Sequence, residues 1–134
     1  MKSKKVFKDD KVTTILGIKS ANPGHILLLP KKHYLDMPQV TEDELVHMFM
    51  VAKSLSNILL KTMKAKGTTI FAANGALAGQ KAPHFMIHVI PRFDGDGLNF
   101  VPPEIAISDE KLNGVNASLC LSIGTLGKLS PFLF

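Results

Sequence analysis

Two histidines, His84 and His88, lie four residues apart in the apolar segment "HFMIHVIPR", which covers residues 84–92. A neutral imidazole can act near pH 7 as a nucleophile, as a proton donor or acceptor, or as a metal ligand. Met86 lies midway between the two histidines and offers only a thioether, which is a weak acceptor. The segment is therefore either part of a functional site or a core strand whose histidines bond to backbone carbonyls.

The residues around the histidines predict a strand over 84–91. Prolines bracket the segment, and β-branched residues fill its second half. Side chains at alternate positions of a strand share one face, so His84, Met86 and His88 are expected on the same face. The two histidines would then lie roughly 13 Å apart. That is too far to share one zinc ion, whose nitrogen ligands lie at about 2.0 Å, so we expect no metal site and no cofactor.

The rest of the chain predicts the elements that would position this segment. "TEDE" at 41–44 is typical of a capping box at a helix start, and apolar residues then recur at helical spacing as far as Met63. Gly67 is the expected stop. Short runs rich in β-branched and apolar residues predict further strands at 6–8, 11–18, 25–30 and 68–73. Ser108 is expected to cap a weaker final helix. Strands, a helix, strands and a helix in this order favour an α+β domain with an antiparallel sheet.

Composition restricts the partners and the location. The 134 residues carry a formal charge of +5, almost all from lysine, since Arg92 is the only arginine. This excess suits an anionic ligand, but no arginine cluster or basic-aromatic stripe indicates nucleic acid. One cysteine, Cys120, excludes an internal disulfide and is typical of a cytoplasmic protein. The apolar runs are too short to cross a membrane. A single domain is the expectation for this length.

Several separate motifs together resemble those of the histidine triad (HIT) family. "GQKAPHFMIHVIPR" (79–92) is similar to the family's Gly-Gln followed by three alternating histidines, and "PGHILLLPKKH" (23–33) is similar to its "PGHxLxxPKxH" segment. The resemblance covers roughly residues 6–97 in one order. It implies a HIT-like domain over 1–134, with a core at 6–97 and a variable segment at 98–134. It also implies a five-stranded antiparallel sheet, one long helix, a shorter carboxyl-terminal helix and a homodimer.

The resemblance also implies a ligand and a reaction. Family members bind purine nucleotides, and many hydrolyse or transfer nucleotidyl groups. The middle histidine attacks the α-phosphorus and forms a nucleotidyl-imidazole intermediate. In this chain Met86 falls on that position, and a thioether attacking phosphorus would become a sulfonium with no proton to lose. Two positions that bind the ligand in the family are also changed, since Gly17 and Ala73 stand where polar residues are usual. In addition, Lys81 follows Gly-Gln, where Ser or Thr is usual.

A nucleotide site with a changed centre is therefore expected. His88 and Lys81 are candidates to bind phosphate, His25 is expected to support the triad structurally together with His84, and the remaining candidates are either backbone donors for an anion or an apolar slot for the base. The full set of binding candidates is Ile15, Leu16, Ile18, Gly79, Gln80, Lys81, Ala82 and His88. In the alternative interpretation these residues have only structural roles, with Gly79 in a tight turn, Lys81 in solvent and the isoleucines in the core.

Three functional hypotheses follow from this set. The first is a purine nucleotide-binding protein that lacks the covalent mechanism, acting as a binder or as a dimeric scaffold. The second is an active hydrolase or nucleotidyl transferase that uses His88 or His84 as the catalytic residue, or a water molecule, with Lys81 stabilising charge. The third is binding of another small phosphate or anion, which the lysine-rich surface favours.

Overall fold

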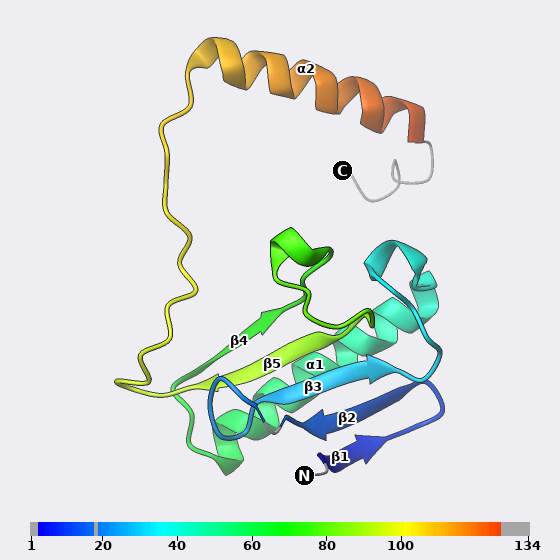
Figure 1. Ribbon diagram of the computed structural model, residues 1–134, viewed down its shortest axis with the longest axis vertical. Helices are drawn as coiled ribbons and strands as arrows, with labels where there is room; N and C mark the ends of the chain where they lie inside the picture. The colour runs from blue at the N-terminus through cyan, green and yellow to red at the C-terminus, as the bar shows by residue number, and fades with distance from the viewer. Residues whose placement is uncertain (1–2, 18, 127–134) are drawn as a thin grey trace. The chain divides into compact units, whose positions relative to one another are not determined.

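The structure is a computed structural model that describes residues 3–17 and 19–126 (Figure 1). The chain forms two compact units, residues 1–98 and residues 99–134, and each is described by itself. The first unit contains the sheet and the long helix. Whether the two units make up a single domain stays a prediction.

Five short strands form one antiparallel sheet in the order β1-β2-β3-β5-β4, which confirms the predicted α+β architecture (Figure 1). Each strand contains β-branched or apolar residues, and the segment between β2 and β3 contains glycine, proline and asparagine. The strands β1 and β4 are the two edges. The strand bounds are β1 Lys4–Lys8, β2 Val12–Leu16, β3 Ile26–Pro30, β4 Gly67–Phe71 and β5 Ile87–Arg92.

The long helix α1 runs from Glu42 to Thr62 and covers one face of the sheet. Thr41 caps it as predicted, because its side chain accepts a hydrogen bond from the Glu44 N–H. Four residues of its apolar stripe are buried: Met48, Ala52, Leu55 and Leu59. The helix ends five residues before the predicted stop at Gly67, and the chain turns instead through Lys64, whose φ is 53°.

The core lies between α1 and the face of the sheet that the helix covers. Phe85, Ile87 and Val89 are buried there at alternate positions, together with Ile26 and Leu28 of β3. We call the opposite side of the sheet the outer face. Since alternate side chains of a strand point to opposite faces, Met86 and His88, each half-buried, lie on the outer face.

β5 begins at Ile87, three residues later than the predicted strand. His84 therefore lies in the bend that precedes the strand. Met86 and His88 share the extended segment that leads into β5, as expected, but His84 does not. The reason is a hydrogen bond to a loop that is distant in the sequence. The Phe85 N–H donates to the Tyr34 carbonyl at 2.7 Å, in the loop beyond β3, so this part of the chain lies outside the ladder.

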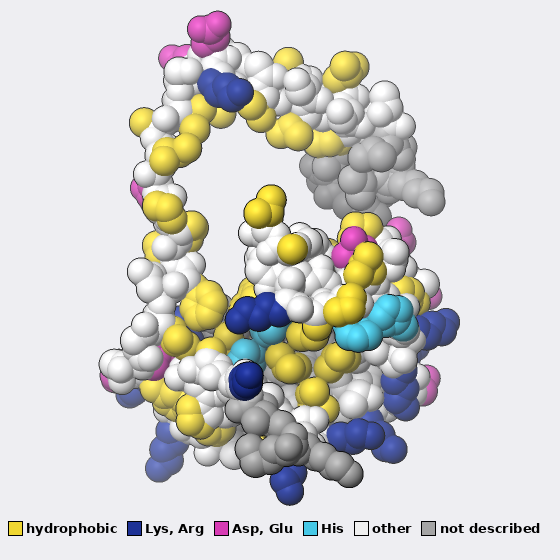
Figure 2. Space-filling model, viewed as in Figure 1, with side chains coloured by type: hydrophobic (Ala, Val, Ile, Leu, Met, Phe, Trp, Pro, Cys, Tyr) yellow, Lys and Arg dark blue, Asp and Glu magenta, His cyan; other side chains and the backbone are white. Residues whose placement is uncertain are grey.

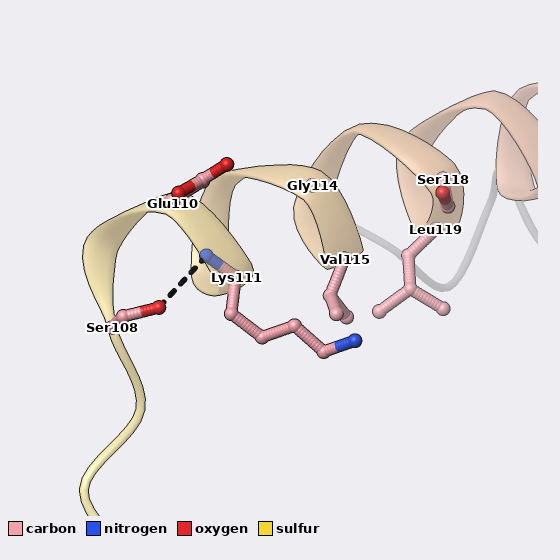
Figure 3. Close-up of a pocket in the computed structure, with 7 residues that line it drawn as sticks. All are labelled: Ser108, Glu110, Lys111, Gly114, Val115, Ser118 and Leu119. Atoms are coloured by element: carbon pink, nitrogen blue, oxygen red, sulfur yellow. Dashed lines mark hydrogen bonds between the residues drawn. The ribbon is translucent and has the colours of Figure 1, made fainter.

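The second unit contains α2, Asp109–Leu126, which agrees with the predicted weaker helix. Ser108 accepts from the Lys111 N–H at 3.2 Å, and Figure 3 shows this bond at the first turn. A hollow of about 700 Å³ runs along one side of the helix, but its lining contains no histidine or cysteine. Among residues 3–17 and 19–126, no helix is long and apolar enough to cross a membrane.

Candidate functional site

Antiparallel pairing places His88 at the centre of a row of side chains on the outer face. Leu27 of β3 pairs with His88 on one side, and Phe71 of β4 pairs with it on the other. Ile15 of β2 pairs in turn with Leu27. The Phe71 ring stacks on the His88 ring with centroids 4.3 Å apart and an interplanar angle of 1°. The row therefore combines one imidazole with an apolar surface on both sides.

His25 holds His88 through a hydrogen bond that determines which ring nitrogens carry protons. The Ala21 N–H donates to Nδ1 of His25 at 3.0 Å, so that nitrogen has a lone pair. A neutral imidazole carries one proton, which must then be on Nε2 of His25. This nitrogen lies 3.0 Å from Nδ1 of His88 and donates to it. His88 therefore accepts through Nδ1 and carries its own proton on Nε2.

The environment keeps both histidines neutral. Burial, with smaller contributions from the nearby His25 and the Lys81 ammonium, lowers the pKa of His88 to about 4. Burial also lowers the pKa of His25. His88 Nε2 makes no hydrogen bond to another described residue. It reaches the surface, because no fully buried side-chain nitrogen in the described chain lacks a partner. The site thus presents an uncharged N–H donor at neutral pH.

The loop before β5 contributes a cation and two further donors. Lys81 is exposed, and its charge is near enough to affect His88. The backbone N–H groups of Lys81 and Ala82 donate to no other residue in the described ranges. Together with His88 Nε2, they offer three donors and one positive charge to an anion.

Gly79 and Gln80 play a scaffolding part in the same loop. Their N–H groups are already bonded, to the carbonyls of Ala76 and Gly75. The Gln80 side chain accepts from the Gly75 N–H at 2.8 Å and donates to the Leu35 carbonyl at 2.6 Å. Gly79 adopts a φ of 102°, which an L side chain rarely takes. These two residues shape the loop, which already uses both of their backbone N–H groups.

His84 belongs to a different group from His88. Its Nδ1 lies 2.8 Å from Nδ1 of His33, and the two rings meet edge to face with centroids 4.5 Å apart. Figure 2 shows histidine side chains in two separate groups on this side of the molecule. The second group borders a cavity of about 240 Å³ beside Lys31 and Lys32. The described residues contain no group of three or more histidine, cysteine or acidic side chains able to hold a metal.

The remaining candidates are divided between the two faces. Ile15 joins the His88 row, whereas Leu16, the next residue along β2, lies on the α1 side and packs against the core. Ile18 lies outside the described residues. The sequence analysis did not identify Phe71, Leu27 or His33 as neighbours of the candidate histidines. The alternation of β3 and β4 alone could have placed Leu27 and Phe71 on a face, but only the strand order makes them neighbours of His88.

Comparison with known proteins adds relatives to this geometry. The family model described as HIT domain matches residues 1–95. A HIT-like protein of Methanocaldococcus jannaschii is 38% identical over 95 residues, which is 71% of this chain and 73% of that protein. An asymmetrical bis(5'-nucleosyl)-tetraphosphatase of Schizosaccharomyces pombe is 31% identical over 108 residues, 80% of this chain and 58% of that enzyme.

A solved structure agrees with the sequence relatives. The crystal structure of a histidine triad nucleotide-binding protein from Candida albicans matches with a TM-score of 0.82 at 26% identity, over 94% of this chain and 92% of that one. The family match spans more than half of the chain, and the M. jannaschii relative exceeds 30% identity over more than two thirds of it. The chain therefore belongs to the HIT domain family.

Proposed function

We propose that the protein binds a purine nucleotide on the outer face of the sheet and lacks the covalent nucleotidyl-histidine reaction. The observation that carries this proposal is the hydrogen-bond chain from Ala21 through His25 to His88, which leaves His88 with a proton on its exposed nitrogen. A group in this state donates to a phosphoryl oxygen and is not a nucleophile.

The phosphate end of the ligand has a set of donors available. His88 Nε2 and the amides of Lys81 and Ala82 supply hydrogen bonds, and the Lys81 ammonium supplies charge. Charge-assisted bonds of this kind are about twice as strong as neutral ones. The apolar surface that Ile15 and Leu27 form beside His88 suits the flat face of a base.

A covalent step has no suitable group on this face. Met86 occupies the position that the family resemblance assigns to the nucleophile, and a sulfonium formed there would have no proton to lose. The lone pair of neutral His88 is on Nδ1, where the His25 N–H already occupies it. His84 shares its Nδ1 contact with His33 and sits before the strand. Catalysis through either histidine, with Lys81, is the alternative that an activity assay distinguishes.

Binding is tested by calorimetric titration of AMP and GMP into the pure protein. We expect saturable binding that His88→Asn weakens about tenfold or more. Asparagine keeps an acceptor for His25 but has neither the ring nor its Nε2–H. Lys81→Ala is expected to weaken binding, while Lys53→Ala, an exposed α1 lysine, serves as the matched control. An unchanged affinity in His88→Asn, or no heat at millimolar nucleotide, would contradict the proposal.

Activity is tested with an adenosine phosphoramidate and a dinucleoside polyphosphate. We expect no turnover above background and no trapped nucleotidyl adduct on the native chain. Met86→His supplies the missing imidazole, and we expect it to produce a detectable adduct because the neighbouring donors are in place. Turnover by the native chain that His88→Asn abolishes would instead support the hydrolase or transferase alternative.

The partner we propose is a second copy of the chain, joined along β4. The β1 edge carries three lysines, which guard a strand against pairing, whereas β4 carries no charge. Ile70 pairs with Val89 and so lies on the α1 side of the sheet, where it is exposed. Phe49 and Leu60 are exposed on α1 along the same flank as Ser56, which contacts β4 through Thr68.

A further inference from the structure

A second concave surface lies on the side of the sheet away from the His25–His88 site. It runs between β1 and the part of α1 from His47 onwards, has a volume of about 810 Å³, and we call it the β1–α1 groove. Leu16 and Ile26 form its floor from the sheet side. The other apolar lining residues are Val6, Phe7, Met50, Val51, Leu55, Ile58, Leu59 and Met63. Among the described residues, only His47, Ser54 and Thr62 line it with polar side chains.

Contacts between the sheet and the helix close the groove at both ends. At one end Nε2 of His47 lies 2.7 Å from the Asp9 carboxylate in the β1–β2 turn. At the other end Gly24 lies so close to α1 that an added Cβ would come within 2.5 Å of the Met63 sulfur. His47 and Met63 are sixteen residues apart, which is roughly 24 Å along a helix axis. The groove is therefore a bounded trough with room for about four helical turns.

The margins of the groove are basic. β1 contributes Lys4, which pairs with Leu16 on the α1 side of the sheet, and Lys61 and Lys64 flank the Met63 end on the other margin. All three side chains are exposed, and within the described chain none forms an ion pair. A trough that is apolar inside and positively charged at its rim complements an occupant with an apolar stripe between acidic edges.

We propose that the β1–α1 groove binds an amphipathic helix of a partner protein whose polar edges carry Asp and Glu. The scarcity of polar lining groups argues for a helix over an extended peptide. A helix satisfies its own backbone hydrogen bonds, whereas an extended segment would leave its N–H and C=O groups unpaired against apolar side chains. The helix would lie on the flank of α1 away from β4, so it competes neither with the nucleotide nor with pairing along β4.

The test uses the full chain and a designed probe. The probe is a fluorescent sixteen-residue helical peptide with leucine at positions i, i+3 and i+4 of each turn and glutamate on both flanks of the stripe. Two comparison peptides have the same composition in scrambled order, or lysine in place of glutamate. Fluorescence polarisation is expected to show micromolar binding of the probe, and at least about tenfold weaker binding of both comparison peptides.

Variants of the chain locate the binding surface. Ile58→Glu places a charge in the groove wall and is expected to weaken probe binding about tenfold or more. Leu77→Glu, at a fully exposed apolar residue outside the groove, is expected to leave it within about twofold. Lys4 is exposed on β1 at the groove margin, and Lys4→Glu is expected to weaken binding several-fold without affecting folding. Nucleotide titration of each variant confirms that the outer face is intact.

Several outcomes overturn the proposal. They are equal binding of the scrambled peptide, no effect of Ile58→Glu or Lys4→Glu, or no probe binding at millimolar concentration. If laurate binds saturably and the helical peptide does not bind, the groove would be assigned to a fatty acyl chain instead. Self-association that Ile58→Glu removes would assign it to a second copy of this chain.

Discussion

His88 connects the chemistry of the outer face to the stability of the fold. Its ring is half-buried, stacked on Phe71 and bonded to His25, and this arrangement requires the neutral form. An imidazolium would place a second proton on Nδ1, directly opposite the proton that His25 donates. The same contacts that make His88 a donor for an anion therefore make the folded state sensitive to acid.

This coupling predicts the pH dependence of stability. The folded pKa of about 4 is below the ordinary value of 6.5, so between these pH values the unfolded chain binds a proton that the folded chain does not. The contribution of His88 is fully present above about pH 6.5 and is lost as the pH falls towards 4. Melting of the native chain and of His88→Asn at about pH 7.5 and about pH 4.5 checks this. An equal acid-induced loss in both chains would contradict it.

Asp96 is a second residue whose charge holds the structure together. Its carboxylate accepts from Arg92 at 2.8 Å, from Asn22 at 3.0 Å and from the backbone N–H groups of Phe93 and Leu98. The Arg92 guanidinium and the backbone donors hold its pKa well below the usual range. The bonds tie the β2–β3 turn to the end of β5.

We expect Asp96→Asn to lower the melting temperature at neutral pH by on the order of 5–10 °C, because the charge-assisted bonds become neutral and one donor replaces an acceptor. The exposed Asp94, two residues away, provides the control substitution Asp94→Asn, which is expected to melt like the native chain. Differential scanning calorimetry measures both. Similar melting of the two variants would show that the carboxylate charge is not required.

Motif positions indicated part of this candidate site, and contacts supplied the rest. The resemblance to the HIT family identified His88, Lys81 and His25 as candidates, because they occupy defined positions in its motifs. It also proposed Gly79 and Gln80 as anion donors, but the loop uses their N–H groups internally. Which amide is free depends on the turn that the loop adopts, and residue type does not determine that. The pairing of His33 with His84 depends on chain segments 51 residues apart.

At the scale of elements, the strands and helices were predicted well because each has a local signal. Alternation, the Thr41 cap and the turn residues near Asn22 act over a few residues. The ends of elements were predicted less well. β5 starts at Ile87 and not at His84 because the Phe85 N–H pairs with Tyr34, a contact with a distant loop. The end of α1 before Gly67 likewise depends on how the chain turns into β4.

Gly24 and Gly79 have similar φ angles but different surroundings, so substituting each one distinguishes backbone strain from a packing clash. Gly24 and Gly79 have φ values of 91° and 102°. An added Cβ at Gly79 meets nothing within 4 Å, but at Gly24 it comes within 2.5 Å of the Met63 sulfur. We expect Gly79→Ala to destabilise the fold by about 1–2 kcal/mol through the backbone alone, and Gly24→Ala to cost more.

Urea denaturation of both variants measures the difference. Adding Met63→Ala to Gly24→Ala removes the close sulfur, and we expect the double variant to recover part of the lost stability relative to the sum of the two single changes. Equal losses for the two glycine variants would show that backbone strain dominates at both positions and that the contact between the turn and α1 adapts.

At the scale of the whole molecule, the sheet has two edges with opposite character. β1 carries Lys4, Lys5 and Lys8, whereas β4 reads "GTTIF" and carries no charge. The sequence predicted a homodimer only through family resemblance, because an edge cannot be recognised until the strand order is known. The predicted cytoplasmic location rests on the single cysteine and stays a prediction.

The unprotected edge leads to the last prediction. If a second copy pairs along β4, Ile70→Lys places a charge on that edge and exposes the apolar residues Phe49 and Leu60 that the pairing would cover. We expect the native chain to be a dimer and Ile70→Lys to be a monomer at micromolar concentration. Lys5→Ala, which removes a charge from the other edge, is expected to remain dimeric. Light scattering after size-exclusion chromatography measures the mass directly. A native monomer, or a dimer that Lys5→Ala changes and Ile70→Lys does not, would place any assembly away from β4.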